Sequence, residues 1–132
     1  MITVTIWHNA ARDGEGRPTG MLDGYRPGDQ MVRVFAYQAD PAGRDPEEIA
    51  EEAFAICNGH PGDPGGEELA RRYYARELRS LSKGDVVAVG EAGLAVARVG
   101  WTLITGGLNE VRTSEHGTRP LPSISPRKEP GT

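Results

Sequence analysis

The sequence has few of the features that mark a secreted, fibrous or membrane-spanning protein. It contains one cysteine, Cys57, in 132 residues, so no intramolecular disulfide can form and nothing requires an oxidising compartment. Residues 1–13 lack the basic segment and apolar core of a secretion signal. No apolar run approaches the roughly 18 residues of a transmembrane helix. We therefore expect a cytoplasmic protein with no membrane partner.

Nucleotide-binding and catalytic motifs are also missing. Neither GxGxxG nor GxxxxGK followed by serine or threonine occurs in the chain. Ser80 and Ser82 do not lie in a nucleophile elbow, and no histidine follows them at a suggestive spacing. We predict that the protein is not an enzyme and that it binds no cofactor and no metal.

One local arrangement offers an alternative. Cys57, His60 and Asp63 lie together in the segment CNGHPGD, which could hold a metal or a Cys57/His60 nucleophile pair. A structural zinc site usually takes four ligands that include paired cysteines, and a single cysteine does not supply them. Cys57 also falls on the apolar face of a predicted helix, where a small buried side chain is ordinary.

Charge is distributed unevenly along the chain, whose formal net charge is −4. Residues 41–68 hold one basic and eight acidic residues, whereas residues 69–84 hold five basic residues and one acidic residue. These blocks would be two solvated helix faces that attract each other. Alternatively, the basic block would form a patch that contacts phosphate or an acidic partner protein.

The segment 79–105 is the part of the chain around which we expect the rest to be organised. A polar turn at 82–85 precedes the β-branched run 86–89, and a second turn at 90–93 leads into 94–99. Glycine and aspartate favour turns, and β-branched residues favour extended chain. The pattern predicts a β-hairpin that continues past Gly100 into residues 101–104.

Two further strands and a loop precede this hairpin. Residues 2–8 and 31–37 alternate apolar and polar side chains, the period of a half-buried strand. Residues 9–28 are rich in glycine, arginine, aspartate and proline, which predicts a long loop. Within it, residues 20–25 would pack back as a short strand or turn.

Helix signals are confined to the middle of the chain. Asp45, Pro46 and Glu48 match an N-cap, a first-turn proline and a capping box, and Asn58-Gly59 is a favourable end, so we predict a helix over 46–58. A second helix is expected from Glu67 to a point within 76–78.

These elements predict an α+β fold: a small, curved, mostly antiparallel sheet of four to five strands packed against one or two helices. We assign residues 1–113 to a single domain. Residues 114–132 contain four prolines and few apolar residues, so we expect a flexible, disordered C-terminal tail.

The segment 79–87 reads RSLSKGDVV, and a later strand is introduced by Val99-Gly100-Trp101. This pattern resembles the YodL-like domain, which occurs in proteins of bacterial plasmids, phages and integrative elements. The likeness covers residues 79–104 and extends more loosely to the strand 31–38 and to the helix before Tyr73-Tyr74. It implies a mobile-element accessory protein, concerned with transfer or counter-defence, that has no established catalysis. The positions it singles out are Arg79, Ser80, Ser82, Asp85 and Trp101.

Two functions follow as predictions. The first is a non-enzymatic module, encoded by a mobile element, that binds a host or element-encoded protein. The alternative is a nucleic-acid-binding accessory protein, in which cations of the 71–83 surface contact phosphates and a nearby aromatic ring stacks on a base. The basic residues of that surface are Arg71, Arg72, Arg76, Arg79 and Lys83.

Overall fold

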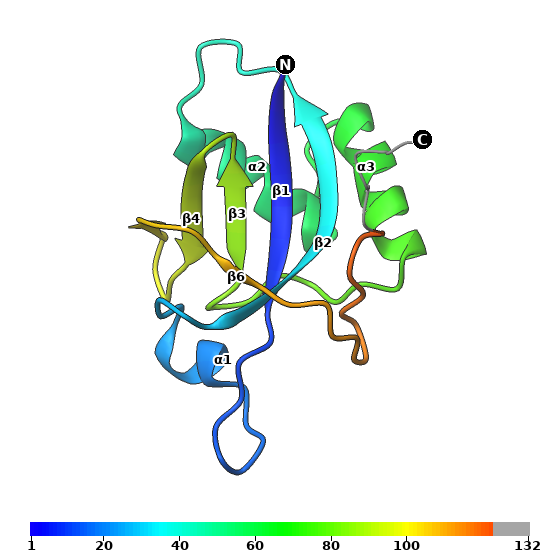
Figure 1. The fold of residues 1–132 in the computed structure, drawn as a ribbon. Helices are drawn as coiled ribbons and strands as arrows, with labels where there is room; N and C mark the ends of the chain where they lie inside the picture. Colours follow the sequence, from blue (N-terminus) through cyan, green and yellow to red (C-terminus); the bar gives the residue numbers. More distant parts are fainter. Residues whose placement is uncertain (123–132) are drawn as a thin grey trace, which may run out of the picture.

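The computed structural model describes residues 1–122 of the chain as a curled, mostly antiparallel sheet of six strands with three helices (Figure 1). The strand order is β5-β4-β3-β1-β2-β6. The α+β class, the curvature and the mostly antiparallel pairing agree with the sequence prediction. The counts differ, since four to five strands and one or two helices were expected. The strands and helices are β1 (Ile2–Asn9), α1 (Thr19–Asp23), β2 (Gln30–Ala39), α2 (Pro46–Cys57), α3 (Pro64–Ala75), β3 (Val86–Val89), β4 (Ala92–Val96), β5 (Trp101–Ile104) and β6 (Asn109–Glu110).

The long strands β1 and β2 form the centre of the sheet. They pair antiparallel from Ile2 opposite Ala39 to Asn9 opposite Met31, and the register shifts between Ile6 and Trp7. Such an irregularity bends a strand and increases its twist, which fits the curled shape in Figure 1. The alternation predicted for β1 is confirmed, because Val4 and Ile6 are buried while Thr3 is exposed.

The predicted hairpin is confirmed, and it extends the sheet to one edge. Strand β3 pairs antiparallel with β1 on one side and with β4 on the other. Strand β4 begins at Ala92, inside the stretch predicted to be a turn, because the connection needs only Gly90 and Glu91. Strand β5 then pairs antiparallel with β4, from Trp101 opposite Val96 to Ile104 opposite Gly93.

Helix α2 forms where the capping signals predict it. The Asp45 carboxylate accepts a hydrogen bond from the Glu48 amide (2.8 Å), and the Glu48 carboxylate accepts one from the Asp45 amide (2.9 Å). These reciprocal bonds satisfy two N–H groups that have no partner within the helix. The apolar face buries Ile49 and Ile56 against the sheet.

Helix α3 begins three residues earlier than predicted, at Pro64 rather than Glu67. The Asp63 carboxylate accepts a hydrogen bond from the Gly66 amide at 2.7 Å, so this aspartate is the N-cap. Proline suits the first helical position because its missing N–H would have no helical partner there. The Pro-Gly-Gly sequence therefore forms the first turn of the helix and not a loop.

Residues 9–28 are not wholly loop. Residues 19–23 form the short helix α1 instead of the expected strand or turn, and Gly20 of this helix is buried. A Cβ atom at Gly84 would come within 2.6 Å of the Gly20 backbone, so α1 packs directly on the turn before β3.

The C-terminal segment was predicted to leave the domain at residue 114, but residues 114–122 pack against it. Thr118 is 1% exposed, and the Leu121 amide donates to the carbonyl of Arg33 at 2.8 Å. Just before this segment, the two-residue strand β6 pairs parallel with β2, which the sequence did not predict. The remainder of the predicted tail, residues 123–132, lies outside the described residues.

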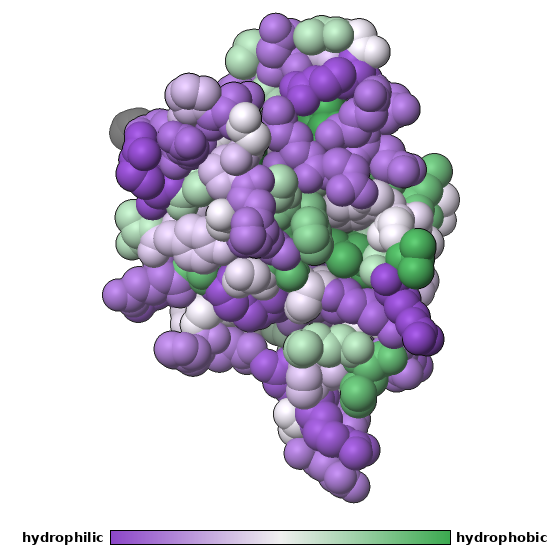
Figure 2. Space-filling view, turned by 180° about the vertical axis from the view of Figure 1, so that it is seen from behind, coloured by the Kyte–Doolittle hydropathy of each residue, from purple (hydrophilic) through white to green (hydrophobic). Residues whose placement is uncertain are grey.

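The main core lies between the sheet and helices α2 and α3, which cover one face of the sheet (Figure 1). Met31, Val86 and Ala95 form a second, smaller cluster, with Trp7 and Leu108 packed against it. Seen from behind, the molecule is mostly hydrophilic, and its apolar areas are small and separate (Figure 2). No helix within residues 1–122 is long and apolar enough to cross a membrane.

Candidate functional site

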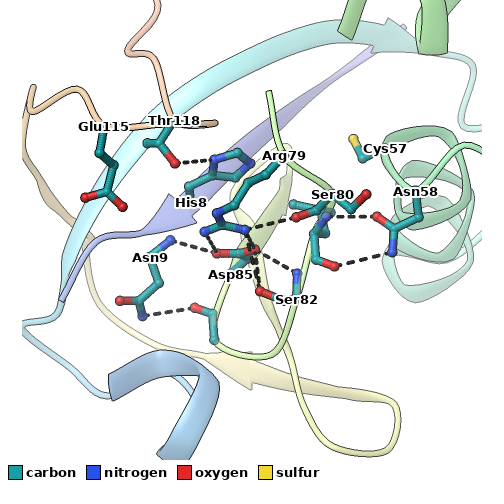
Figure 3. A network of polar contacts seen from close by, with 12 residues as sticks. His8, Asn9, Cys57, Asn58, Arg79, Ser80, Ser82, Asp85, Glu115 and Thr118 are labelled. Atoms are coloured by element: carbon teal, nitrogen blue, oxygen red, sulfur yellow. Dashed lines mark hydrogen bonds and ion pairs between the residues drawn. The ribbon is translucent and has the colours of Figure 1, made fainter. Parts of the chain in front are cut away.

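An ion pair between the buried Asp85 and the partly exposed Arg79, just before β3, is the centre of the polar network in Figure 3. The guanidinium of Arg79 donates to both carboxylate oxygens of Asp85, at 2.7 and 2.9 Å. The backbone amides of Asn9 and Ser82 also donate to this carboxylate, each at 2.8 Å. Burial lowers the pKa of Arg79, but the hydrogen bonds and negative charge of Asp85 outweigh it, and the pKa is raised. The arginine therefore carries a permanent charge on a fixed partner.

The turn that carries Asp85 is fixed to the end of β1. The side-chain amide of Asn9 donates to the carbonyl of Gly84 at 3.1 Å and to the carboxylate of Asp29 at 3.0 Å. Gly84 has a φ of +94°, a backbone conformation that residues other than glycine rarely adopt. The Gly-Asp pair of the segment RSLSKGDVV thus serves two needs, a left-handed turn and a buried acceptor.

A second set of polar contacts joins β1 to α3 and to the C-terminal segment. His8 is fully buried; its Nε2 lies 2.8 Å from the Tyr73 hydroxyl and its Nδ1 lies 3.0 Å from Thr118 Oγ1. The Tyr73 hydroxyl donates its one hydrogen to the carbonyl of Arg79 at 2.5 Å, so it accepts from Nε2–H. Nδ1 then accepts from Thr118. Burial lowers the pKa of His8 to about 4, which keeps this ring neutral.

The predicted basic surface is not brought together as a set of free cations. Arg71 pairs with Glu68 at 2.5 Å on the exposed side of α3, and Arg72 is exposed nearby. Arg76 turns inward and donates to the carbonyls of Val34 (3.0 Å) and Arg119 (2.9 Å). Arg76 therefore acts as a structural donor to the backbone.

The other predicted site residues divide between the network and the edge strand β5. Ser82 lies in the network, and the Ser80 hydroxyl lies 3.2 Å from the Tyr74 hydroxyl. Lys83 donates to the carbonyl of Leu22 at 3.1 Å. Trp101, on β5, does not join them: its indole N–H donates to Glu51 of α2 at 2.8 Å.

Cys57 and His60 lie in different surroundings. The thiol is fully buried on the inner face of α2, and burial raises its pKa. His60 is exposed on the following loop. Among residues 1–122 no three His, Cys, Asp or Glu side chains lie close enough to hold a metal ion.

Sequence reasoning missed the part that His8, Asn9 and Thr118 play in the network. One signal was available, because His8 continues the even-numbered face of β1 that buries Val4 and Ile6. No local pattern indicates that Thr118 contacts it from 110 residues away.

Comparisons of the chain with protein-family profiles, curated proteins and solved structures find no match. The resemblance of residues 79–104 to the YodL-like domain accordingly stays a prediction from the sequence.

Proposed function

We propose that this protein is a non-enzymatic binding module that receives an extended segment of a partner protein along strand β5. The observation that carries the proposal is the open outer edge of this strand. β5 is the last strand of the sheet, and no other strand within residues 1–122 pairs with its outer side. An extended peptide can add a strand to such an edge through main-chain hydrogen bonds.

The pairing with β4 determines which backbone groups of β5 face outward. The Ala97 amide donates to the carbonyl of Gly100 at 3.1 Å and closes a two-residue loop between β4 and β5. Hydrogen-bonded and non-bonded pairs alternate along antiparallel strands, so Thr102 and Ile104 bond to β4. The N–H and C=O groups of Trp101 and Leu103 then point away from the sheet. A partner strand would satisfy them.

The side chains around β5 suit such a partner. Leu103 is 66% exposed, although Leu94, its partner on β4, is buried. Trp101 packs edge-on against Phe54 of α2, with ring centroids 6.1 Å apart, and a cavity of about 180 Å³ adjoins them. Alternate residues of an added strand would project toward this cavity, where side-chain shape gives specificity.

Natural proteins block exposed edges with lysine, proline or inward-pointing charge. The β5 sequence, Trp-Thr-Leu-Ile, contains none of these. The other edge strand, β6, has two residues and is followed directly by the packed C-terminal segment. For these reasons we assign the interface to β5.

The proposed partner is a host or element-encoded protein. That part of the proposal rests on the likeness of RSLSKGDVV and the following strand to the YodL-like domain of mobile elements. The nucleic-acid alternative has weaker support, because Arg76 donates to backbone carbonyls and both terminal nitrogens of Arg79 donate to Asp85. An interface of backbone and apolar contacts would survive moderate salt, whereas phosphate contacts weaken steeply as salt rises.

The test compares two substitutions at one position. Leu103→Pro removes an outward N–H, and proline is tolerated on an edge strand when its nitrogen faces solvent. Leu103→Thr shortens the side chain and keeps the N–H. Partner capture from the native host should be lost with Leu103→Pro and retained, with reduced affinity, with Leu103→Thr. Equal capture by wild type and Leu103→Pro, with both proteins folded, would refute the β5 interface.

A further inference from the structure

A cavity of about 190 Å³ opens beside the Arg79–Asp85 pair, and three cations line it. Arg12 comes from the loop after β1, Arg79 from the connection between α3 and β3, and Lys83 from the turn before β3. We propose that this cavity binds a phosphate-class oxyanion. The proposal goes beyond the partner interface on β5 and does not depend on it.

The charges around the cavity leave an excess of one positive charge. The two carboxylates that line it, Asp85 and Glu115, are each bound to an arginine, Asp85 to Arg79 and Glu115 to Arg12. Lys83 has no carboxylate partner among the described residues. This local excess is opposite in sign to the net charge of −4 on the whole chain. It is therefore a feature of the cavity and not of the general surface.

Donors for an anion are available at the cavity. Lys83 uses one of its three N–H groups, on the carbonyl of Leu22, which leaves two for a ligand. The Nε of Arg79 makes no hydrogen bond with residues 1–122. The exposed His116 adds a further donor at the rim.

The arrangement favours a tetrahedral anion over a carboxylate. Arg12, Arg79 and Lys83 come from separate segments, so their nitrogens approach the cavity independently. A phosphate offers each of them a different oxygen, whereas a carboxylate has two oxygens in one plane. The Asp85 carboxylate does not compete with an anion for the free donors of the cavity. Its oxygens already accept from the backbone amides of Asn9 and Ser82 and from the terminal nitrogens of Arg79.

The test is a titration of the ¹⁵N-labelled full chain with inorganic phosphate at constant ionic strength, followed by amide NMR shifts. We expect saturable shifts at Gly20, Ser82 and Lys83, which line the cavity. Lys83→Met should weaken binding about tenfold, the usual effect of losing one charge-assisted hydrogen bond. Arg71→Met is the matched control, since Arg71 is exposed on α3 and does not line the cavity, and it should leave binding unchanged.

Parallel titrations with phosphoserine and with a nucleoside 5′-monophosphate compare two sources of the phosphate group. The compound that binds more tightly indicates whether the natural ligand is a phosphorylated protein or a nucleotide. Shifts that stay linear in phosphate, or that chloride reproduces, would overturn the proposal. So would equal affinity of wild type and Lys83→Met. The free-protein spectrum of each variant establishes that it is folded, and Arg12→Met is a second variant expected to weaken binding.

Discussion

The carboxylate of Asp85 is almost fully enclosed, with a side chain 1% exposed, whereas its partner Arg79 keeps 32% of its side chain at the surface. The two residues lie six positions apart, on either side of a turn. The pair is therefore asymmetric. Loss of the arginine leaves the negative charge of Asp85 buried without a partner, whereas loss of the carboxylate leaves the positive charge of Arg79, which can be solvated by water.

We expect Arg79→Met to destabilise the protein more than Asp85→Asn does. An unpaired buried charge costs about 3–5 kcal/mol. Asparagine at position 85 buries no charge, and its one side-chain oxygen still accepts from one of the two backbone amides, Asn9 or Ser82, that donate to the two oxygens of Asp85. Urea unfolding of both variants measures the difference. If Asp85→Asn is the more damaging change, the carboxylate is needed for its geometry and not for its pairing with Arg79.

Gly84→Ala should be strongly destabilising for two reasons, its φ of +94° and the approach of a Cβ to within 2.6 Å of Gly20 backbone atoms. Gly28→Ala is the matched control, because its φ is +92° and nothing lies within 4 Å of the added atom. The control should cost about 1–2 kcal/mol for the left-handed backbone alone. Gly84→Ala should cost at least ~2 kcal/mol more. Equal values would show that α1 moves away from the turn freely.

The buried imidazole of His8 should make stability depend on pH. Its pKa falls from 6.5 to about 4 because burial disfavours the charged ring. Below pH 6.5 the unfolded state binds a proton that the folded state does not, so stability is full above pH 6.5 and declines toward pH 4. The loss is up to about 3 kcal/mol.

Denaturant unfolding at pH 7 and at pH 4.5 measures this decline. His8→Gln does not titrate, so its stability should change less between the two pH values than that of wild type. Identical changes in the two proteins would assign the acid sensitivity to other groups.

Thr118→Val removes the hydroxyl that donates to His8 Nδ1 and keeps the shape of the side chain. A buried acceptor without its donor costs about 1–3 kcal/mol. Thr113→Val, at an exposed position, should cost close to nothing. A loss confined to Thr118→Val, measured by thermal unfolding, would confirm that the domain extends beyond residue 113.

The sequence was most informative where the chain makes local choices. The period of two in β1 and the capping box of α2 depend on neighbours within a few residues, and both were predictable. The start of α3 was misjudged because glycine and proline indicate a loop unless an N-cap precedes them, and Asp63 is that cap.

The candidate site was less predictable because it depends on contacts between distant segments. The motif RSLSKGDVV indicated Arg79 and Asp85. No pattern in the neighbouring sequence indicates that the backbone amide of Asn9, 76 residues away, also donates to the Asp85 carboxylate. The excess of basic residues over 69–84 was likewise no guide to the surface. Arg76 contributes to that excess, but its guanidinium donates to the carbonyl of Val34.

The position of β1 at the middle of the sheet has a consequence for synthesis of the protein. Of the described strands, β1 is the first to be translated; it pairs on one side with β3, whose Val89 lies opposite Val4, and its His8 contacts a threonine 110 residues later. The nascent chain thus cannot close its core until nearly all the described residues have been translated. Such distant pairings slow folding, so β1 and β2 would remain together as an incomplete sheet, open to chaperones, for most of translation.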